Sequence, residues 1–157
     1  MLERFSHFGL PLHFTENTII SGDLMPPHIE DLNDWQVSEW PTTPEGEERQ
    51  AREITEMYEI LFAHPMVKAI TTWSGIDGNW LNAPAGLLRK DNSLKPSYHA
   101  LKEKIKDEWR TQAEFRTDAN GEFSMEGFRG NYEVSAGDTK AVFVLDDKND
   151  HVNLVMN

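Results

Sequence analysis

Three side chains in this sequence have the chemistry and the setting of a functional site. Glu16 closes the short apolar run from Leu12, and Trp73 and Trp80 stand at the two ends of a glycine-containing stretch. A carboxylate at the end of a strand can act as a nucleophile, a base or an electrostatic stabiliser. Tryptophan presents a flat apolar face on which a sugar ring can stack. The plainer interpretation of Glu16 is a partner for an arginine or a cap for a helix.

The other candidates have simpler interpretations. Alternation along the strand points His13 to the face opposite Glu16, which we expect to be the face toward the helices. The remaining histidines lack the spacing and carboxylate neighbours of a zinc site, so we predict no metal. Asp77 either shapes a loop or bonds a substrate hydroxyl, and the structural role is favoured. Trp35 and Trp40 either extend a glycan-binding cleft or hold a long loop in place.

Two predicted strands must place these residues at one edge of a sheet. Residues 10–20 and 67–73 are short apolar segments rich in β-branched side chains, which is typical of buried strands. A helix between two strands, with short connections, favours parallel strands that lie side by side. Parallel neighbours end on the same rim, so Glu16 and Trp73 would meet there.

The helix between these strands has clear start and stop signals. Thr43 is a good N-cap before Pro44, and Pro65 disfavours helical geometry at His64. The residues expected on its buried stripe recur at helical spacing: Ala51, Ile54, Tyr58, Leu61 and Phe62. The charged residues form what we expect to be a solvated face: Glu47, Glu48, Arg49, Arg52, Glu53, Glu56 and Glu59.

The rest of the chain divides at about Glu108. Before it, residues 21–44 read as a long irregular loop, and Lys95-Pro96 opens a second helix that reaches Trp109. After it, alternating aromatic stretches and turn signals predict antiparallel strands with hairpins. Two of these strands are expected at residues 141–145 and 151–155, joined by a polar turn at 146–150.

Composition narrows the classes of partner. The 157 residues carry a formal net charge of -12, which argues against binding to nucleic acid phosphates or to an anionic membrane. An uncharged partner fits this net charge better than either of these anionic ones. The absence of cysteine excludes disulfides and thiolate metal sites. We see no apolar run long enough to span a membrane, and residues 1–5 lack the features of a secretory signal.

Several motifs occur in a fixed order along the first two thirds of the chain. They are Gly9 to Glu16, Gln50-Ala51, Trp73 to Trp80, Gly86-Leu87-Leu88 and Lys95 to Leu101. Together, over roughly residues 1 to 106, they resemble the last third of glycoside hydrolase family 10, which holds endo-β-1,4-xylanases. No single motif is specific for this family, and the resemblance rests on the order in which the whole set occurs. The resemblance implies an α/β fold in which residues 1–108 form the seventh and eighth strands and helices of a (β/α)8 TIM barrel.

The resemblance also implies roles. Glu16 matches the carboxylate nucleophile of these retaining enzymes, and Trp73 and Trp80 match residues that line the sugar subsites beside the cleaved bond. No cofactor is implied, and the expected location is secreted or periplasmic. Retaining glycosidases need a second carboxyl group about 5–5.5 Å from the first. The family supplies it from an Asn-Glu-Pro motif, which this sequence lacks, and Thr18 stands where the family usually has an Asp.

The last part of the chain resembles a second kind of module. Residues 118–134 follow the theme Asp-x-x-Gly-x-Phe and Gly-x-Tyr of small β-sandwich modules of carboxypeptidase-regulatory type. We therefore expect residues 109–157 to form a small all-β sandwich, either whole or incomplete. Its role would be packing or spacing, or carbohydrate binding.

These inferences lead to a functional hypothesis with an alternative. We expect a fragment of a retaining endo-glycosidase that acts on a β-1,4-xylan-type polysaccharide. The alternative is a non-catalytic barrel remnant or a carbohydrate-binding or structural β-module. A quarter of a barrel exposes unpaired strand edges and bare apolar helix stripes, so we expect a longer gene product or a partner that supplies the remaining barrel.

Overall fold

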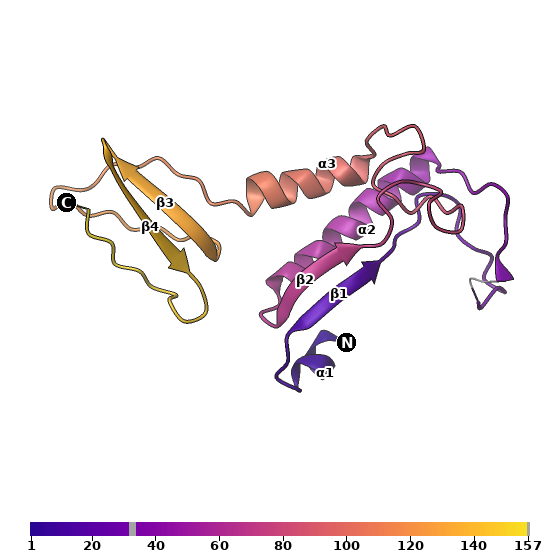
Figure 1. Ribbon diagram of the computed structural model, residues 1–157, viewed down its shortest axis with the longest axis horizontal. Coiled ribbons are helices and arrows are strands. Elements are labelled where there is room, and N and C mark those ends of the chain that lie inside the picture. Colours follow the sequence, from indigo (N-terminus) through magenta and orange to yellow (C-terminus); the bar gives the residue numbers. More distant parts are fainter. Residues whose placement is uncertain (32–33, 157) are drawn as a thin grey trace. The chain divides into compact units, whose positions relative to one another are not determined.

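The computed structural model describes residues 1–31 and 34–156 (Figure 1). Its chain forms two compact units, residues 1–104 and residues 105–157. The first unit contains the two strands that bear Glu16 or precede Trp73, and the helix between them. The second unit contains one β-hairpin. Each unit is described by itself.

The first unit is built around a strand-helix-strand motif. Strands β1 (Leu12–Asn17) and β2 (Val67–Thr72) pair in parallel, and helix α2 (Pro44–Ala63) connects them. A short helix, α1 (Leu2–Ser6), precedes β1. The predicted parallel pairing is confirmed, although β1 is shorter at both ends than the predicted strand at residues 10–20. The described residues form a two-stranded sheet here and do not close a barrel.

Helix α2 begins and ends where the local signals predict. The Thr43 side chain accepts a hydrogen bond from the backbone N–H of Gly46 at 3.0 Å, and Pro44 occupies the first turn. His64 leaves the helical conformation just before Pro65. Ile54, Tyr58 and Leu61 are buried as expected, whereas Phe62 is exposed and Ala51 is half-buried. The buried side of α2 also contains Gly46, Glu47 and Gln50.

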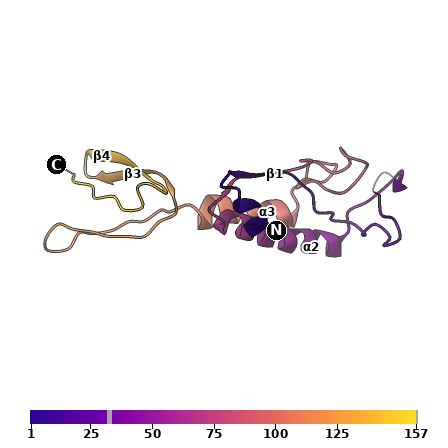
Figure 2. The ribbon, with the colours of Figure 1, turned by 90° about the horizontal axis from the view of Figure 1, so that it is seen from below.

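Helix α3 (Pro96–Glu103) packs against α2 and continues as a π-helical turn over Lys104–Glu108. Both α2 and α3 lie on the same face of the β1–β2 sheet (Figure 2). Phe14 faces this helical layer, because it lines a surface hollow together with Ile60 and Leu61 of α2. The expectation that His13 points toward the helices is therefore wrong: it neighbours Phe14 on the strand, is exposed, and belongs to the opposite face.

The register between the two strands contains an extra residue near the end of β1. Phe14 pairs with Ile70 and Asn17 pairs with Thr72, so three steps along β1 match two steps along β2. The Asn17 side chain stabilises this irregularity by donating from Nδ2 to the carbonyl of Thr71 at 3.1 Å and to that of Phe14 at 3.4 Å. The simple alternation that placed Glu16 on the face of Phe14 is interrupted here.

A small apolar cluster holds the predicted loop at residues 21–44 against the loop that follows β2. Its buried members are Trp40, Ala83 and Ala85, and Trp35 and Trp80 pack against them, half-buried. Trp35 and Trp40 meet edge to face with ring centroids 6.1 Å apart, and Trp40 Nε1 donates to the carbonyl of Asp23. This packing favours the loop-holding interpretation of Trp35 and Trp40 over the cleft interpretation.

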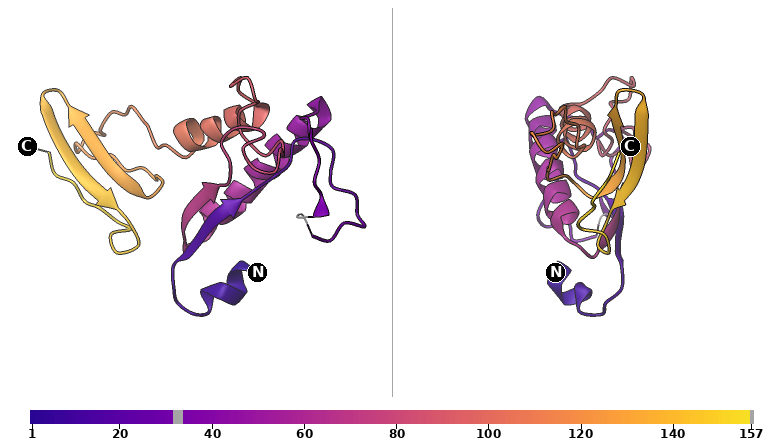
Figure 3. Two further views of the ribbon diagram at one scale, coloured as in Figure 1. Left: turned by 45° about the vertical axis from the view of Figure 1, so that its right-hand side comes forward. Right: turned by 90° about the vertical axis from the view of Figure 1, so that its left-hand side faces the viewer.

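The second unit contains an antiparallel hairpin, β3 (Gly130–Ala136) and β4 (Thr139–Leu145), whose long ribbon is visible in Figure 3. Tyr132 and Phe143 stack across it with ring centroids 5.0 Å apart. The predicted strand at 141–145 is confirmed, but the one at 151–155 is wrong, and β4 pairs through the turn at Gly137 rather than through residues 146–150. In the described part of this unit a second sheet is absent, so the expected β-sandwich is not formed.

Among the described helices, none has both the length and the apolar character needed to cross a membrane.

Candidate functional site

The structure brings Glu16 and Trp73 to one rim of the parallel sheet. The backbone N–H of Trp73 donates to the carbonyl of Asn17 at 2.8 Å, so Trp73 leaves β2 beside the residue that follows Glu16. Both residues are accessible: Glu16 is exposed, and Trp73 is 41% exposed. Loops at the carboxyl ends of parallel strands are the usual place for reacting groups. This rim is the candidate functional site.

The chain turns sharply just after Trp73. Ser74 has a positive φ of 67°, and its Oγ donates to the carbonyl of Ile76 at 2.8 Å. A non-glycine residue in this region is uncommon and costs free energy, so the surrounding structure must hold it. The extended conformation of β2 thus ends directly after Trp73.

Trp80 has a different environment from Trp73. It is half-buried against the Trp40 cluster, and the backbone around it is closed by hydrogen bonds from Gly78 N–H to the Ala83 carbonyl and from Ala83 N–H to the Trp80 carbonyl. These contacts give Trp80 a structural role in the loop after β2. Its predicted role in sugar binding stays a prediction.

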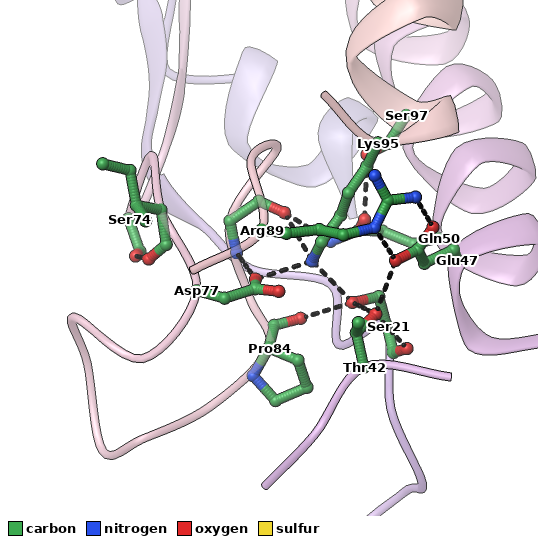
Figure 4. A network of polar contacts seen from close by, with 12 residues as sticks. Ser21, Thr42, Glu47, Gln50, Ser74, Asp77, Pro84, Arg89, Lys95 and Ser97 are labelled. Atoms are coloured by element: carbon green, nitrogen blue, oxygen red, sulfur yellow. Dashed lines mark hydrogen bonds and ion pairs between the residues drawn. The ribbon is translucent and has the colours of Figure 1, made fainter. Parts of the chain in front are cut away.

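The loops that follow the two strands contain a buried ion pair between Lys95 and Asp77, drawn in Figure 4. Lys95 Nζ donates to Asp77 Oδ1 at 2.6 Å, to Ser21 Oγ at 2.7 Å and to the carbonyl of Gly86 at 3.0 Å. The lysine is fully buried. Burial lowers its pKa, while the hydrogen bond and the charge of Asp77 act in the opposite direction. Asp77 thus has the structural role that the sequence favoured.

Ser21 and Asp77 extend this network to the two loops. Ser21 Oγ contacts the carbonyl of Pro84 and Thr42 Oγ1, each at 2.8 Å, and Asp77 Oδ1 accepts from the backbone N–H of Gly86 at 2.9 Å. The Ser21 backbone also donates to Pro84. The loop after β1 and the loop after β2 are therefore joined through buried polar groups that have partners.

Helix α2 joins the same network through Glu47 and Gln50. Glu47 accepts hydrogen bonds from Arg89 on both carboxylate oxygens and from Thr42 on one. Burial acts to raise the pKa of Glu47, but the hydrogen bonds from Arg89 and Thr42 outweigh it, and the pKa is lowered. Glu47 is thus buried and paired, which corrects its expected place on a solvated face. Gln50 donates to the carbonyls of Ile19 and Gly86.

The network itself is not a catalytic centre. A lysine beside a serine hydroxyl resembles a nucleophile with its base. Here, however, Ser21 and Lys95 are both fully buried, Ser21 Oγ lies within hydrogen-bond distance of a carbonyl, and Lys95 is ion-paired with Asp77. Over residues 1–31 and 34–156, no group of three or more histidine and carboxylate side chains is arranged to hold a metal ion.

Sequence reasoning missed Lys95, Arg89, Ser21 and Gln50 as organising residues. In the sequence Lys95 opens a helix and begins one of the family motifs, neither of which predicts a buried ion pair, and the partners of Arg89 and Ser21 lie far away along the chain. The one signal in the sequence was the glycine at position 86. In the structure this position has no room for a side chain, since an added Cβ would lie 2.6 Å from the backbone carbon of Ile76. A glycine with no room for a side chain marks a close approach of two backbone segments.

Comparison with known proteins gives two partial likenesses. No family model matches the chain. The anti-sigma-I factor RsgI6 of Acetivibrio thermocellus (strain ATCC 27405) is 26% identical over 130 residues, which cover 82% of this chain and 16% of that protein. The structure of xylanase 10B from Thermotoga petrophila RKU-1 in complex with xylobiose has a TM-score of 0.48 and 24% identity, over 68% of this chain and 30% of that one. The chain thus spans a small part of either protein.

Proposed function

We propose that residues 1–104 form the nucleophile-bearing edge of a retaining endo-glycosidase that acts on a β-1,4-xylan-type polysaccharide. One observation carries the proposal: the hydrogen bond from Trp73 N–H to the Asn17 carbonyl sets the exposed residue Trp73 beside the strand end that bears Glu16. A carboxylate and an aromatic face at one rim are the two elements that a glycosidase needs around the sugar it attacks. The ordered family 10 motifs support the same assignment.

In this proposal Glu16 attacks the anomeric carbon and forms a glycosyl-enzyme intermediate, while Trp73 stacks on the sugar. Trp80 would line the adjacent part of the site from its place in the loop after β2. The leaving oxygen must be protonated by a second carboxylic acid. That acid and the remaining strands would come from a longer chain or from a partner. A polymer of this kind is met outside the cell, so the proposal includes a secreted or periplasmic location.

A second candidate function is non-catalytic glycan binding within a larger regulatory protein. The observation that favours it is the likeness to a protein named as an anti-sigma factor, over most of this chain. In this candidate the Glu16 carboxylate would not react, and Trp73 would serve binding alone.

Binding by the chain as it stands can be tested by titrating xylohexaose into the ¹⁵N-labelled protein and following the indole N–H signals by NMR. We expect the Trp73 signal to shift, and Trp73→Ala to weaken binding by about fivefold or more, because the stacking face that is lost contributes on the order of 1 kcal/mol. Phe62→Ala is the matched control: it removes an exposed aromatic side chain at the far end of α2. No shift in the wild-type protein would overturn both candidates.

Hydrolysis separates the two candidates. For the 157-residue chain alone we expect no release of reducing sugar from xylan, because the acid is missing. When the chain is combined with the polypeptide that supplies the acid, the glycosidase proposal expects hydrolysis that Glu16→Gln reduces by several orders of magnitude. Hydrolysis unchanged by Glu16→Gln would show that Glu16 is not the nucleophile. Binding without hydrolysis in the completed assembly would favour the non-catalytic candidate.

A further inference from the structure

Lys95 is a charged residue that the proposed chemistry does not use and that the fold nevertheless buries completely. A buried ammonium group is costly unless its protons are well paired. Lys95 meets that condition with three acceptors within 3.0 Å: the Asp77 carboxylate, the Ser21 hydroxyl and the Gly86 carbonyl. Figure 4 shows the ammonium group between Asp77 and Ser21. This pairing raises the question of what the charge achieves.

The three acceptors belong to two different loops. Ser21 lies five positions after Glu16, in the loop that follows β1, whereas Asp77 and Gly86 belong to the loop that follows β2. Lys95 itself precedes α3 and is held by a hydrogen bond from its backbone N–H to the Leu87 carbonyl at 3.1 Å. One ammonium group therefore fixes the two loops that leave the rim of the candidate site.

The loop after β2 depends on Lys95 because the hydrogen bonds within this loop also converge on Asp77, the partner of the lysine. Asp77 donates from its backbone N–H to the Leu88 carbonyl and accepts from Gly86 through its side chain, so the loop folds back on itself around the lysine. Only three residues, 74–76, separate Asp77 from Trp73. A displacement of Asp77 would thus be passed to the indole over a very short stretch of chain.

We propose that Lys95 is a positioning residue for the glycan site: by binding Ser21 and Asp77 together it holds Trp73 in place beside the strand that carries Glu16. This inference rests on the proposed function, since it concerns the same site. It adds a residue that touches no sugar and that the motif resemblance does not assign to binding. A purely space-filling role would be met by a methionine, whereas the positioning role needs the charge.

The test compares Lys95→Met with Lys104→Met in the full chain. Lys104 is a matched control, because it is also ion-paired, to Glu59 at 2.6 Å, but lies at the end of α3 away from the loops. Two quantities are measured: amide hydrogen exchange of Gly78 and Ala83, whose N–H groups are hydrogen-bonded within the loop after β2, and the dissociation constant of xylohexaose. Circular dichroism and urea unfolding report whether each variant folds.

We expect Lys95→Met to speed exchange at both amides and to weaken xylohexaose binding about tenfold, since it leaves the Asp77 carboxylate buried without its partner. Lys104→Met should change neither. The double variant Lys95→Met with Asp77→Asn removes the unpaired charge as well and should recover part of the fold's stability but not the affinity. This variant also decides the question if Lys95→Met alone fails to fold.

Three results would overturn the inference. If Lys95→Met matches Lys104→Met in both quantities, Lys95 does not hold the loops. If exchange speeds up but the dissociation constant stays the same, or if the double variant binds as well as the wild type, the lysine stabilises the fold without positioning the site. If the wild-type chain does not bind xylohexaose, the proposed function itself fails and the positioning role falls with it, a result distinct from the other two.

Discussion

Arg89 binds both carboxylate oxygens of Glu47, with its Nε 2.7 Å from Oε1 and its second guanidinium nitrogen on Oε2. The pair links the loop after β2 to the first turn of α2. Two parallel charge-assisted hydrogen bonds of this kind are stronger than a single contact between exposed charges. The Glu47 side chain is only 8% exposed, so water does little to replace the arginine when the pair is broken.

We predict that Glu47→Gln lowers the free energy of unfolding by about 1–3 kcal/mol, because it leaves a buried polar group poorly matched to Arg89. Urea unfolding followed by circular dichroism measures the change. Glu48→Gln is the control, since Glu48 is the exposed neighbour on the same helix and its loss should cost less than about 0.5 kcal/mol. Equal effects of the two substitutions would mean that the pair with Arg89 contributes nothing to stability.

The same pair makes stability depend on acid. Because the pKa of Glu47 is lowered in the folded state from its usual 4.5, its contribution is present above pH 4.5 and is lost as the pH falls through the folded value. The difference in unfolding free energy between the wild type and Glu47→Gln should therefore shrink below about pH 4.5. Because both proteins are measured, contributions that are equal in the two are removed from this difference. A difference that stays constant down to pH 2 would contradict this prediction.

Gly86 should not accept a side chain. A Cβ there would lie 2.6 Å from the backbone carbon of Ile76 and 2.7 Å from the backbone nitrogen of Asp77, and backbone cannot give way as a flexible side chain does. We expect Gly86→Ala to destabilise the protein by about 1–3 kcal/mol, the usual range for overpacking. Gly75→Ala, in the same loop but with open space around the new methyl group, should be nearly neutral. The melting temperatures of the two variants give the comparison.

The two tryptophans of the proposed glycan site should differ in their effect on stability. Trp80 packs against the buried cluster around Trp40, so Trp80→Ala should lower the free energy of unfolding by about 2 kcal/mol or more. Trp73 is much more exposed, and Trp73→Ala should cost less than about 1 kcal/mol. Chemical denaturation measures both. If Trp80→Ala were the milder change, the packing role of Trp80 would be wrong.

Local signals in the sequence predicted the elements that depend on neighbours along the chain. Thr43, Pro44 and Pro65 determine both ends of α2, alternating apolar residues mark β1, and β-branched residues mark β2. The segment 151–155 shows where such signals fail. Its composition suits a strand, but a strand forms only where a partner strand offers hydrogen bonds, and none is paired with it in the described residues.

The candidate site likewise has one part that the sequence predicts and another part that it does not. The common rim of Glu16 and Trp73 follows from the parallel pairing of β1 and β2, which the order of elements predicts. The contacts of the polar network do not follow from it, because Lys95 meets Ser21 across 74 positions and Arg89 meets Glu47 across 42. Charged residues on a helix are usually solvated, so a sequence pattern alone gives no reason to bury Glu47. These pairs of residues meet only because the folded backbone brings distant segments of the chain together.

The extra residue between Phe14 and Asn17 constrains how this segment can change in length. Removing one residue there would shift the pairing of Asn17 with Thr72 by one position, and the side chains that follow on β1 would turn to the other face of the sheet. The Asn17 amide would also lose its place over the Thr71 carbonyl. Replacement of Thr15 or Glu16 by another residue leaves this geometry intact. For the pairing of the two strands, the length of the segment from Phe14 to Asn17 is therefore more constrained than the identity of the residues within it.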